Sequence, residues 1–116
     1  MGSDRELIEL AAKAAKLKIE WEEEHGCFWV GLGQGLACKP WEPLTDDGDA
    51  LRLFCALSWM VIETSDVGVT VRERGESAGR VYFICTEWLD NHAGDVSAAT
   101  RRAIVRAAAE IGKTLG

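Results

Sequence analysis

Hydrophobic residues recur along this chain with two different periods, and the order of the two periods restricts the folds that are open to it. A period of two is typical of half-buried strands, whereas a period near 3.6 is typical of amphipathic helices. Helices are expected at residues 4–16, 46–58 and 97–116, and strands at 17–22, 27–32, 59–63, 67–72 and 80–88. This α-β-β-α-β-β-β-α order predicts an α+β fold, with an antiparallel sheet of about five strands flanked by three helices.

Local signals set several of the expected element ends. Thr45 precedes a first turn that holds three carboxylates, so it is predicted to cap the second helix. That helix is apolar nearly all round, which predicts that it is well buried. Gly112 and Gly116 are interpreted as stop signals of the last helix. Two prolines within residues 39–43 predict a loop there.

Size and charge narrow the functional classes. A length of 116 residues predicts one domain that spans residues 1–116. The composition, 47% apolar and 28% charged, is that of a globular protein. The formal net charge of −6 repels phosphate backbones, so a nucleic-acid partner is disfavoured without being ruled out. A basic protein partner fits this charge better, as does mimicry of the charge of nucleic acid.

Targeting and redox signals predict a cytoplasmic protein. No apolar run approaches the roughly 18 residues of a membrane span, so no membrane contact is expected. Asp4 and Arg5 stand where the apolar core of a signal peptide would begin. Cys55 and Cys85 lie inside apolar runs, which is typical of buried, reduced thiols. The sequence carries no signal for an oligomeric state.

Two segments carry a resemblance to a known family. They are WEPLTDDGDALRLFCAL (residues 41–57) and AATRRAIVRAAAEIGK (residues 98–113), and the opening DRELIELAAKAA is also similar. Together these segments cover 45 of the 116 residues. They resemble small proteins of tailed phages and prophages, in the phage ABA sandwich domain family. The resemblance implies a sheet between helical layers and a phage or prophage origin, and it implies no activity.

Candidate sites for chemistry lack the patterns that their chemistry needs. His25, Cys27 and Cys38 supply one tight pair of zinc ligands where two are usual. Residues 31–35 are glycine-rich but precede no helix, so they do not form a phosphate-binding loop. No cysteine or serine stands in a nucleophile motif. We therefore predict no enzyme activity, no cofactor and no metal.

The first candidate for partner binding is the acidic segment around the second helix start. Trp41 lies between Pro40 and Pro43, and a tryptophan with little freedom to lose on binding is a good anchor. The alternative is that Trp41 packs down onto Leu44 and Leu51. The other four tryptophans lie on expected strands and are interpreted as core. The candidate residues are Trp41, Glu42, Asp46, Asp47 and Asp49.

The second candidate is the basic face of the last helix. Arg102 and Arg106 share a face there, and Glu110 is placed to pair with Arg106. The leading hypothesis is a non-catalytic phage accessory protein that binds a host or phage protein, and an anti-defence inhibitor of the anti-CRISPR kind is one form of it. The alternatives are a nucleic-acid-binding or replication-associated module and a nucleotide-capturing protein.

Overall fold

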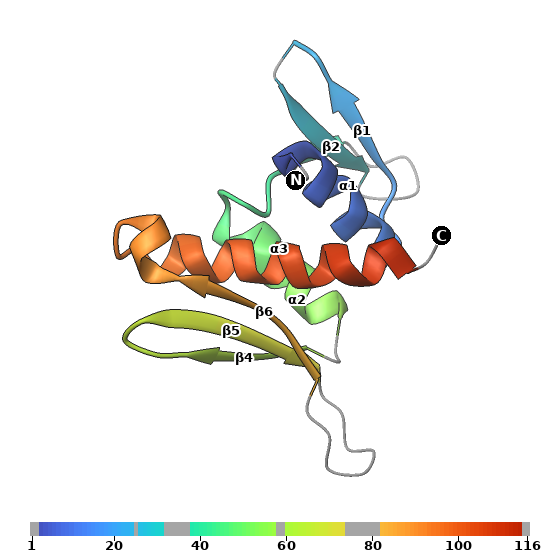
Figure 1. Ribbon diagram of the computed structural model, residues 1–116. Coiled ribbons are helices and arrows are strands. Elements are labelled where there is room, and N and C mark those ends of the chain that lie inside the picture. Colours follow the sequence, from blue (N-terminus) through green and yellow to red (C-terminus); the bar gives the residue numbers. More distant parts are fainter. Residues whose placement is uncertain (1–2, 25, 32–37, 58–59, 74–81, 115–116) are drawn as a thin grey trace.

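The computed structural model describes residues 3–24, 26–31, 38–57, 60–73 and 82–114, and the fold is α+β as predicted. Two antiparallel sheets of three strands each lie on opposite sides of the helices (Figure 1). The helices are α1 (Asp4–Ala14), α2 (Asp47–Ala56) and α3 (Val96–Thr114), with a short 3-10 helix η2 (Leu89–His92) before α3. No described helix combines the length and the apolarity that crossing a bilayer requires.

The expected single sheet of about five strands, flanked by helices, is therefore wrong in its arrangement. The first sheet has the order β1-β2-β3 and the second the order β4-β5-β6. The strands of the first sheet are β1 (Ile19–Glu22), β2 (Cys27–Gly31) and β3 (Cys38–Trp41). The strands of the second sheet are β4 (Met60–Thr64), β5 (Gly68–Glu73) and β6 (Tyr82–Trp88).

The strand that the sequence interpretation missed is β3, in the segment predicted to be a loop. Pro40 lies within β3, opposite Trp29 of β2. Proline has no N–H to donate, but an edge strand tolerates it because one side of the strand needs no partner. Since α2 follows β3 directly, the chain leaves the first sheet there, and β4 pairs with β5 instead.

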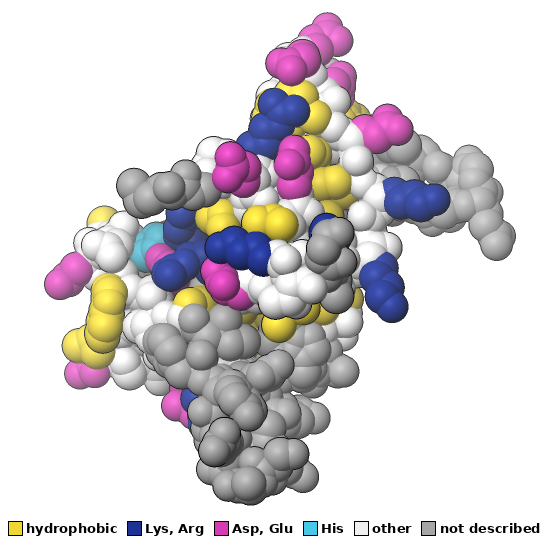
Figure 2. Space-filling model, turned by 45° about the vertical axis from the view of Figure 1, so that its right-hand side comes forward, with side chains coloured by type: hydrophobic (Ala, Val, Ile, Leu, Met, Phe, Trp, Pro, Cys, Tyr) yellow, Lys and Arg dark blue, Asp and Glu magenta, His cyan; other side chains and the backbone are white. Residues whose placement is uncertain are grey.

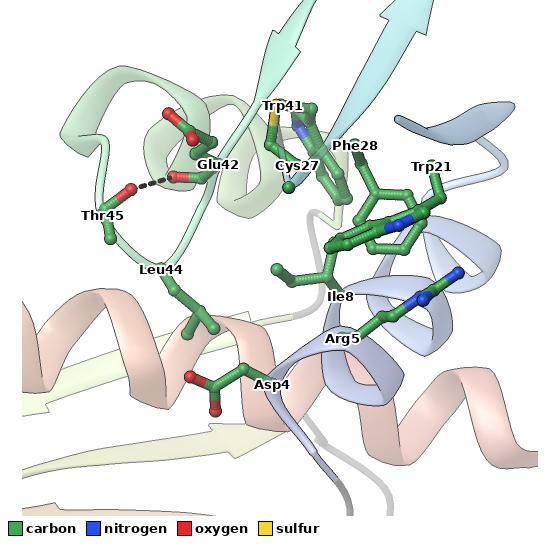
Figure 3. A pocket seen from close by; sticks show the side chains of 11 residues that line it. Asp4, Arg5, Ile8, Trp21, Cys27, Phe28, Trp41, Glu42, Leu44 and Thr45 are labelled. Atoms are coloured by element: carbon green, nitrogen blue, oxygen red, sulfur yellow. Dashed lines mark hydrogen bonds between the residues drawn. The ribbon is translucent and has the colours of Figure 1, made fainter. Parts of the chain in front are cut away.

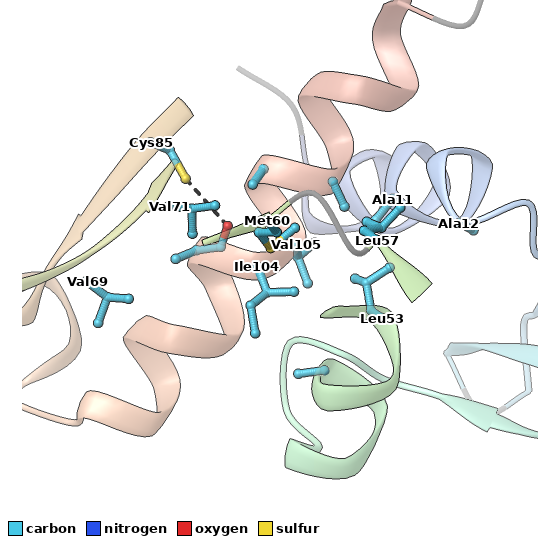
Figure 4. Close-up of a cluster of buried hydrophobic side chains, with 14 of the residues drawn as sticks. Ala11, Ala12, Leu53, Leu57, Met60, Val69, Val71, Cys85, Ile104 and Val105 are labelled. Carbon is cyan, nitrogen blue, oxygen red and sulfur yellow. Dashed lines mark hydrogen bonds between the residues drawn. The ribbon is translucent and has the colours of Figure 1, made fainter. Parts of the chain in front are cut away.

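The core forms where α3 meets its neighbours. The buried face of α3 is rich in alanine, which lets α1, β5 and β6 approach this helix closely. Figure 4 shows larger side chains, among them Leu53, Val71 and Val105, closing the space between α2, α3 and the second sheet. The thiol of Cys85 is buried there and donates to the carbonyl of Ala103 at 3.4 Å.

Helices α1 and α3 approach each other very closely at Gly112. A Cβ atom on Gly112 would lie 2.1 Å from the carbonyl oxygen of Leu10, so no larger residue fits without a backbone shift. The interpretation of Gly112 as a helix stop is wrong, because α3 continues to Thr114. Glycine is needed here for packing between two helices.

The start and the burial of α2 also differ from the prediction. Its N-cap is Asp46, whose carboxylate accepts from the N–H of Asp49 at 2.7 Å, so the predicted cap at Thr45 is wrong. The neighbouring carboxylate outcompetes the hydroxyl of Thr45, which donates to the carbonyl of Glu42 instead. The helix is only partly buried, since Leu51 and Cys55 are exposed.

Candidate functional site

One face of the first sheet carries a row of three aromatic residues. In the strand register Trp21 lies opposite Phe28, and Phe28 lies opposite Trp41, so each strand contributes one ring. Side chains directly across neighbouring strands project on the same face. The rings of Trp21 and Phe28 meet edge to face, with centroids 4.9 Å apart. Phe28 and Trp41 are buried and Trp21 is half-buried.

This aromatic row forms the wall of a hollow of about 210 Å³, which we call the aromatic hollow. Ile8 of α1 and Leu44, from the segment before α2, also belong to its lining, and Figure 3 shows Ile8 beside the ring of Trp21. Two carboxylates, those of Asp4 and Glu42, belong to its lining and come from different elements. The hollow is thus largely apolar, and its charged lining consists of these two carboxylates and the guanidinium group of Arg5.

A guanidinium group already lies on this wall. The Arg5 guanidinium carbon is 4.1 Å from the ring centroid of Trp21 and 6.0 Å from that of Phe28. The negative face of an aromatic ring attracts a cation at such distances. The arrangement therefore has the chemistry that a cationic side chain requires.

The thiol of Cys27 lines the same hollow. Desolvation raises the pKa of this thiol, and the carboxylates of Glu42 and Glu22 raise it further. The thiol is therefore protonated at neutral pH, and only a thiolate is a strong nucleophile. Cys27 thus acts as a small apolar wall residue.

Of the predicted acidic surface, only Trp41 and Glu42 line the hollow. The exposed position expected for Trp41 is wrong, because its side chain is 3% exposed and belongs to the core cluster. The alternative, in which Trp41 packs inward, is confirmed, although Leu51, one of the two residues expected to cover it, is itself exposed. Trp41 is buried because β3 places it in register with Phe28.

The remaining three carboxylates of that surface hold the local structure. Asp46 caps α2, and the buried Asp49 accepts from the backbone N–H of Glu42 at 2.9 Å. Asp47 pairs with Arg101 of α3 at 2.5 Å. These contacts fix the segment that carries Glu42, so the three residues support the hollow and do not form it.

The tryptophans divide differently from the prediction. Trp88 at the end of β6 was expected in the core, yet it is 54% exposed. Trp41 was the candidate for exposure and is buried. Trp59 and His25 lie outside the described residues, as do Gly33 and Gly35 of the glycine-rich segment. Among the side chains that the structure describes, no group of three or more His, Cys, Asp or Glu is placed to hold a metal ion.

The second candidate, Arg102 and Arg106, lies in a separate charged cluster. Arg106 donates to the carboxylate of Glu87, and His92 contacts the same carboxylate at 2.7 Å through Nε2. The expected pair of Arg106 with Glu110 is not formed, since Glu110 accepts from Lys113 instead. Arg106 turns to Glu87 because β6 places that carboxylate beneath α3.

Glu87 is the residue that organises this cluster, and the sequence interpretation missed it. Burial alone would raise its pKa, but the hydrogen bonds from His92 and Arg106 outweigh burial and lower the pKa. Glu87 therefore stays ionised although its side chain is only 7% exposed. The available signal was a single carboxylate inside the apolar run VYFICTEW.

Charge is distributed unevenly between the two halves of the chain. Residues 1–49 contain eleven Asp and Glu against five Lys and Arg, whereas residues 50–116 contain eight of each. The whole formal net charge of −6 therefore falls in the half that carries the aromatic hollow. Figure 2 shows acidic side chains over the tip of the β1–β2 hairpin and beside the apolar surface below it.

Comparison of the chain with protein-family models, curated proteins and solved structures gives no match. The resemblance to phage proteins therefore stays a prediction that rests on the quoted segments.

Proposed function

We propose that this chain is a non-catalytic binding module whose aromatic hollow receives a basic side chain of a partner protein. The observation that carries the proposal is the row of Trp21, Phe28 and Trp41 beside the carboxylates of Asp4 and Glu42. Aromatic rings attract the charged head of arginine or lysine and also cover its apolar stem. The carboxylates add the charge that favours a cation over a neutral side chain.

The size of the hollow supports a side chain as its occupant. Pockets that bury a whole small molecule usually enclose about 300–1,000 Å³. The aromatic hollow encloses about 210 Å³, which suits one long side chain better than a nucleotide. The nucleotide-capturing alternative is therefore not favoured at this place.

The charge of the surrounding half supports a basic partner. Opposite charges on two surfaces speed their encounter and disfavour partners of the wrong sign. All of the net negative charge lies in residues 1–49, so a basic surface would be drawn toward the hollow. The same charge opposes a nucleic-acid phosphate backbone on this side of the molecule.

The resemblance to small phage proteins supports a biological setting for this module. In that setting the chain is a phage or prophage accessory protein in the cytoplasm of the host cell. Its partner is a host or phage protein, and an anti-defence inhibitor of the anti-CRISPR kind would act in this way, by occupying a surface. Binding without chemistry is sufficient for such a role.

A peptide titration tests the proposal. The probes are two fluorescein-labelled peptides of equal length, one with arginines spaced by glycine and serine, the other with glutamates in their place. We expect the arginine peptide to bind and to change the tryptophan fluorescence. Glu42→Gln should weaken its binding about fivefold, because one nearby charge is worth about 1 kcal/mol.

Glu20→Gln is the matched control, because Glu20 lies opposite Trp29, one position along from the aromatic row and on the other face of the sheet. It removes the same charge from the same sheet and should leave peptide binding nearly unchanged. Equal losses in the two variants would show general charge attraction and contradict the proposed site. Equal binding of the two peptides would contradict the proposal as a whole.

A further inference from the structure

A second hollow, of about 580 Å³, is lined by residues of α1, β6, η2 and α3. We call it the basic hollow, because Arg102, Arg106 and Lys113 of α3 line it. His92, Glu87 and Glu110 also belong to its lining. Figure 2 shows the histidine at the surface with Lys, Arg and acidic side chains directly beside it. Counted with Asp4, whose carboxylate accepts from Arg102, three acidic residues balance the three basic ones.

The carboxylate of Glu87 lies deeper in the basic hollow than the two guanidinium groups, whereas that of Glu110 is at the surface and accepts from Lys113. The side chain of Glu87 is 7% exposed, whereas those of Arg102 and Arg106 are 32% and 39% exposed. The carboxylate therefore lies beneath the two guanidinium groups, and it holds Arg106 by a direct hydrogen bond. From solvent, the two guanidinium groups are therefore reached before the carboxylate of Glu87. Glu87 acts as the anchor that positions Arg106.

Several guanidinium donors remain open. Arg106 uses Nη1 for Glu87 and for the carbonyl of Thr86, and no described residue accepts from its Nε or Nη2. Arg102 donates through Nη1 to Asp4, while its Nε lies 4.0 Å from the carboxylate of Glu87, beyond hydrogen-bond reach. A guanidinium carries five N–H donors, so both groups keep donors for an acceptor in the hollow.

We propose that the basic hollow binds one phosphate group, carried by a phosphate monoester. Arginine recognises phosphate with paired donors in a planar fork, and lysine adds a point charge. The basic side chains converge on one hollow and do not form a track along the surface, which fits a single phosphate better than a polymer. The net charge of −6 also opposes a long polyanion.

Asp4 is the competitor that the phosphate must displace. Its carboxylate is 66% exposed and is the partner of Arg102 Nη1, at 3.0 Å. The same carboxylate belongs to the lining of the aromatic hollow. Asp4→Asn should therefore tighten phosphate binding while it weakens binding of the arginine peptide. The opposite signs make failure of this inference distinguishable from failure of the proposed function, on which it does not rest.

Calorimetric or NMR titration at constant ionic strength tests the inference. The probes are inorganic phosphate, a nucleoside 5′-monophosphate, a phosphoserine peptide and a short DNA duplex. Arg102→Gln should weaken binding of inorganic phosphate, of the nucleotide and of the phosphoserine peptide about tenfold, which is the usual contribution of a charged hydrogen bond. Arg52→Gln, an exposed change on α2, is the matched control and should leave binding unchanged.

Arg102 and Lys113 are the residues to change, because Arg106→Gln would remove one of the two direct partners of the buried Glu87 and destabilise the protein. Lys113→Gln should weaken binding by two- to fivefold, as a second, solvent-exposed position. Tighter binding of the nucleotide or of the phosphopeptide than of inorganic phosphate would support the proposal and identify the carrier. No binding of any phosphate probe, or unchanged binding in Arg102→Gln, would overturn it. Preference for the DNA duplex with steep salt dependence would also overturn it.

Discussion

The two sheets meet the helices through different kinds of side chain. The second sheet lies directly on α3, whose buried alanines bring the backbones of helix and sheet close together. The first sheet meets α1 and the segment before α2 through large aromatic rings. Small side chains let two elements pack with their backbones close together, whereas large aromatic rings hold the elements further apart. The aromatic hollow exists for this reason, at the sheet that is held by rings.

Charge separates the same two regions. The region of the first sheet carries all of the net negative charge, and its carboxylates are mostly exposed. The region of α3 is balanced, and its Glu87 is buried under basic side chains. One region thus offers a hollow for a cation, and the other offers a hollow for an anion. The following changes test the comparison.

Trp41→Ala should have the largest effect, a loss of about 3–5 kcal/mol in the free energy of unfolding, because the ring is buried between sheet and helix. Trp88→Ala is the contrasting change, and it should cost about 1 kcal/mol or less because that ring is 54% exposed. Urea denaturation followed by circular dichroism measures both values. Equal losses would mean that the aromatic row does not anchor the first sheet.

Gly112→Ala should cost about 3 kcal/mol, because the new methyl group would overlap the carbonyl of Leu10 and push α1 from α3. Gly48→Ala in the first turn of α2 is the control. The atoms nearest to its Cβ would be side-chain atoms of Arg52 and Asp46, at 3.2 Å, and alanine favours a helix by up to about 1 kcal/mol. Thermal unfolding of both variants checks this. A stable Gly112→Ala variant would contradict close packing of the two helices.

Glu87→Gln should destabilise the protein by about 2 kcal/mol at pH 7, since it removes charged hydrogen bonds to Arg106 and His92. The lowered pKa of Glu87 sets the pH dependence. The stabilising contribution of the ionised Glu87 is present in full above the pKa of an unfolded glutamate, about 4.3, and is lost as the pH falls through the lower pKa of Glu87 in the folded protein.

The difference between wild type and Glu87→Gln should therefore shrink below about pH 4.3, as measured by urea denaturation across a pH series. Glu20→Gln removes an exposed carboxylate from the first sheet and should show little difference from wild type at any pH. A gap that stays constant down to pH 3 would show that Glu87 contributes through packing and not through its charge.

The local elements of this protein could be predicted from its sequence. The α+β class, the three helices and the five predicted strands appear in the structure with small shifts at their ends. These features follow from hydrophobic period and from turn residues, which act over a few neighbouring positions. The inward packing of Trp41 is only one of two alternatives that the sequence leaves open.

Tertiary structure alone decided how the strands associate and which charges meet. The split into two sheets depends on β3, where a proline-containing segment became an edge strand by pairing with β2. The partner of Arg106 is Glu87, nineteen positions away in the chain and on a different element. Local pattern says which residues face inward, but not which inward faces meet. That choice depends on backbone pairing and on the cost of burying a charge without a partner, and both are settled only when distant segments come together.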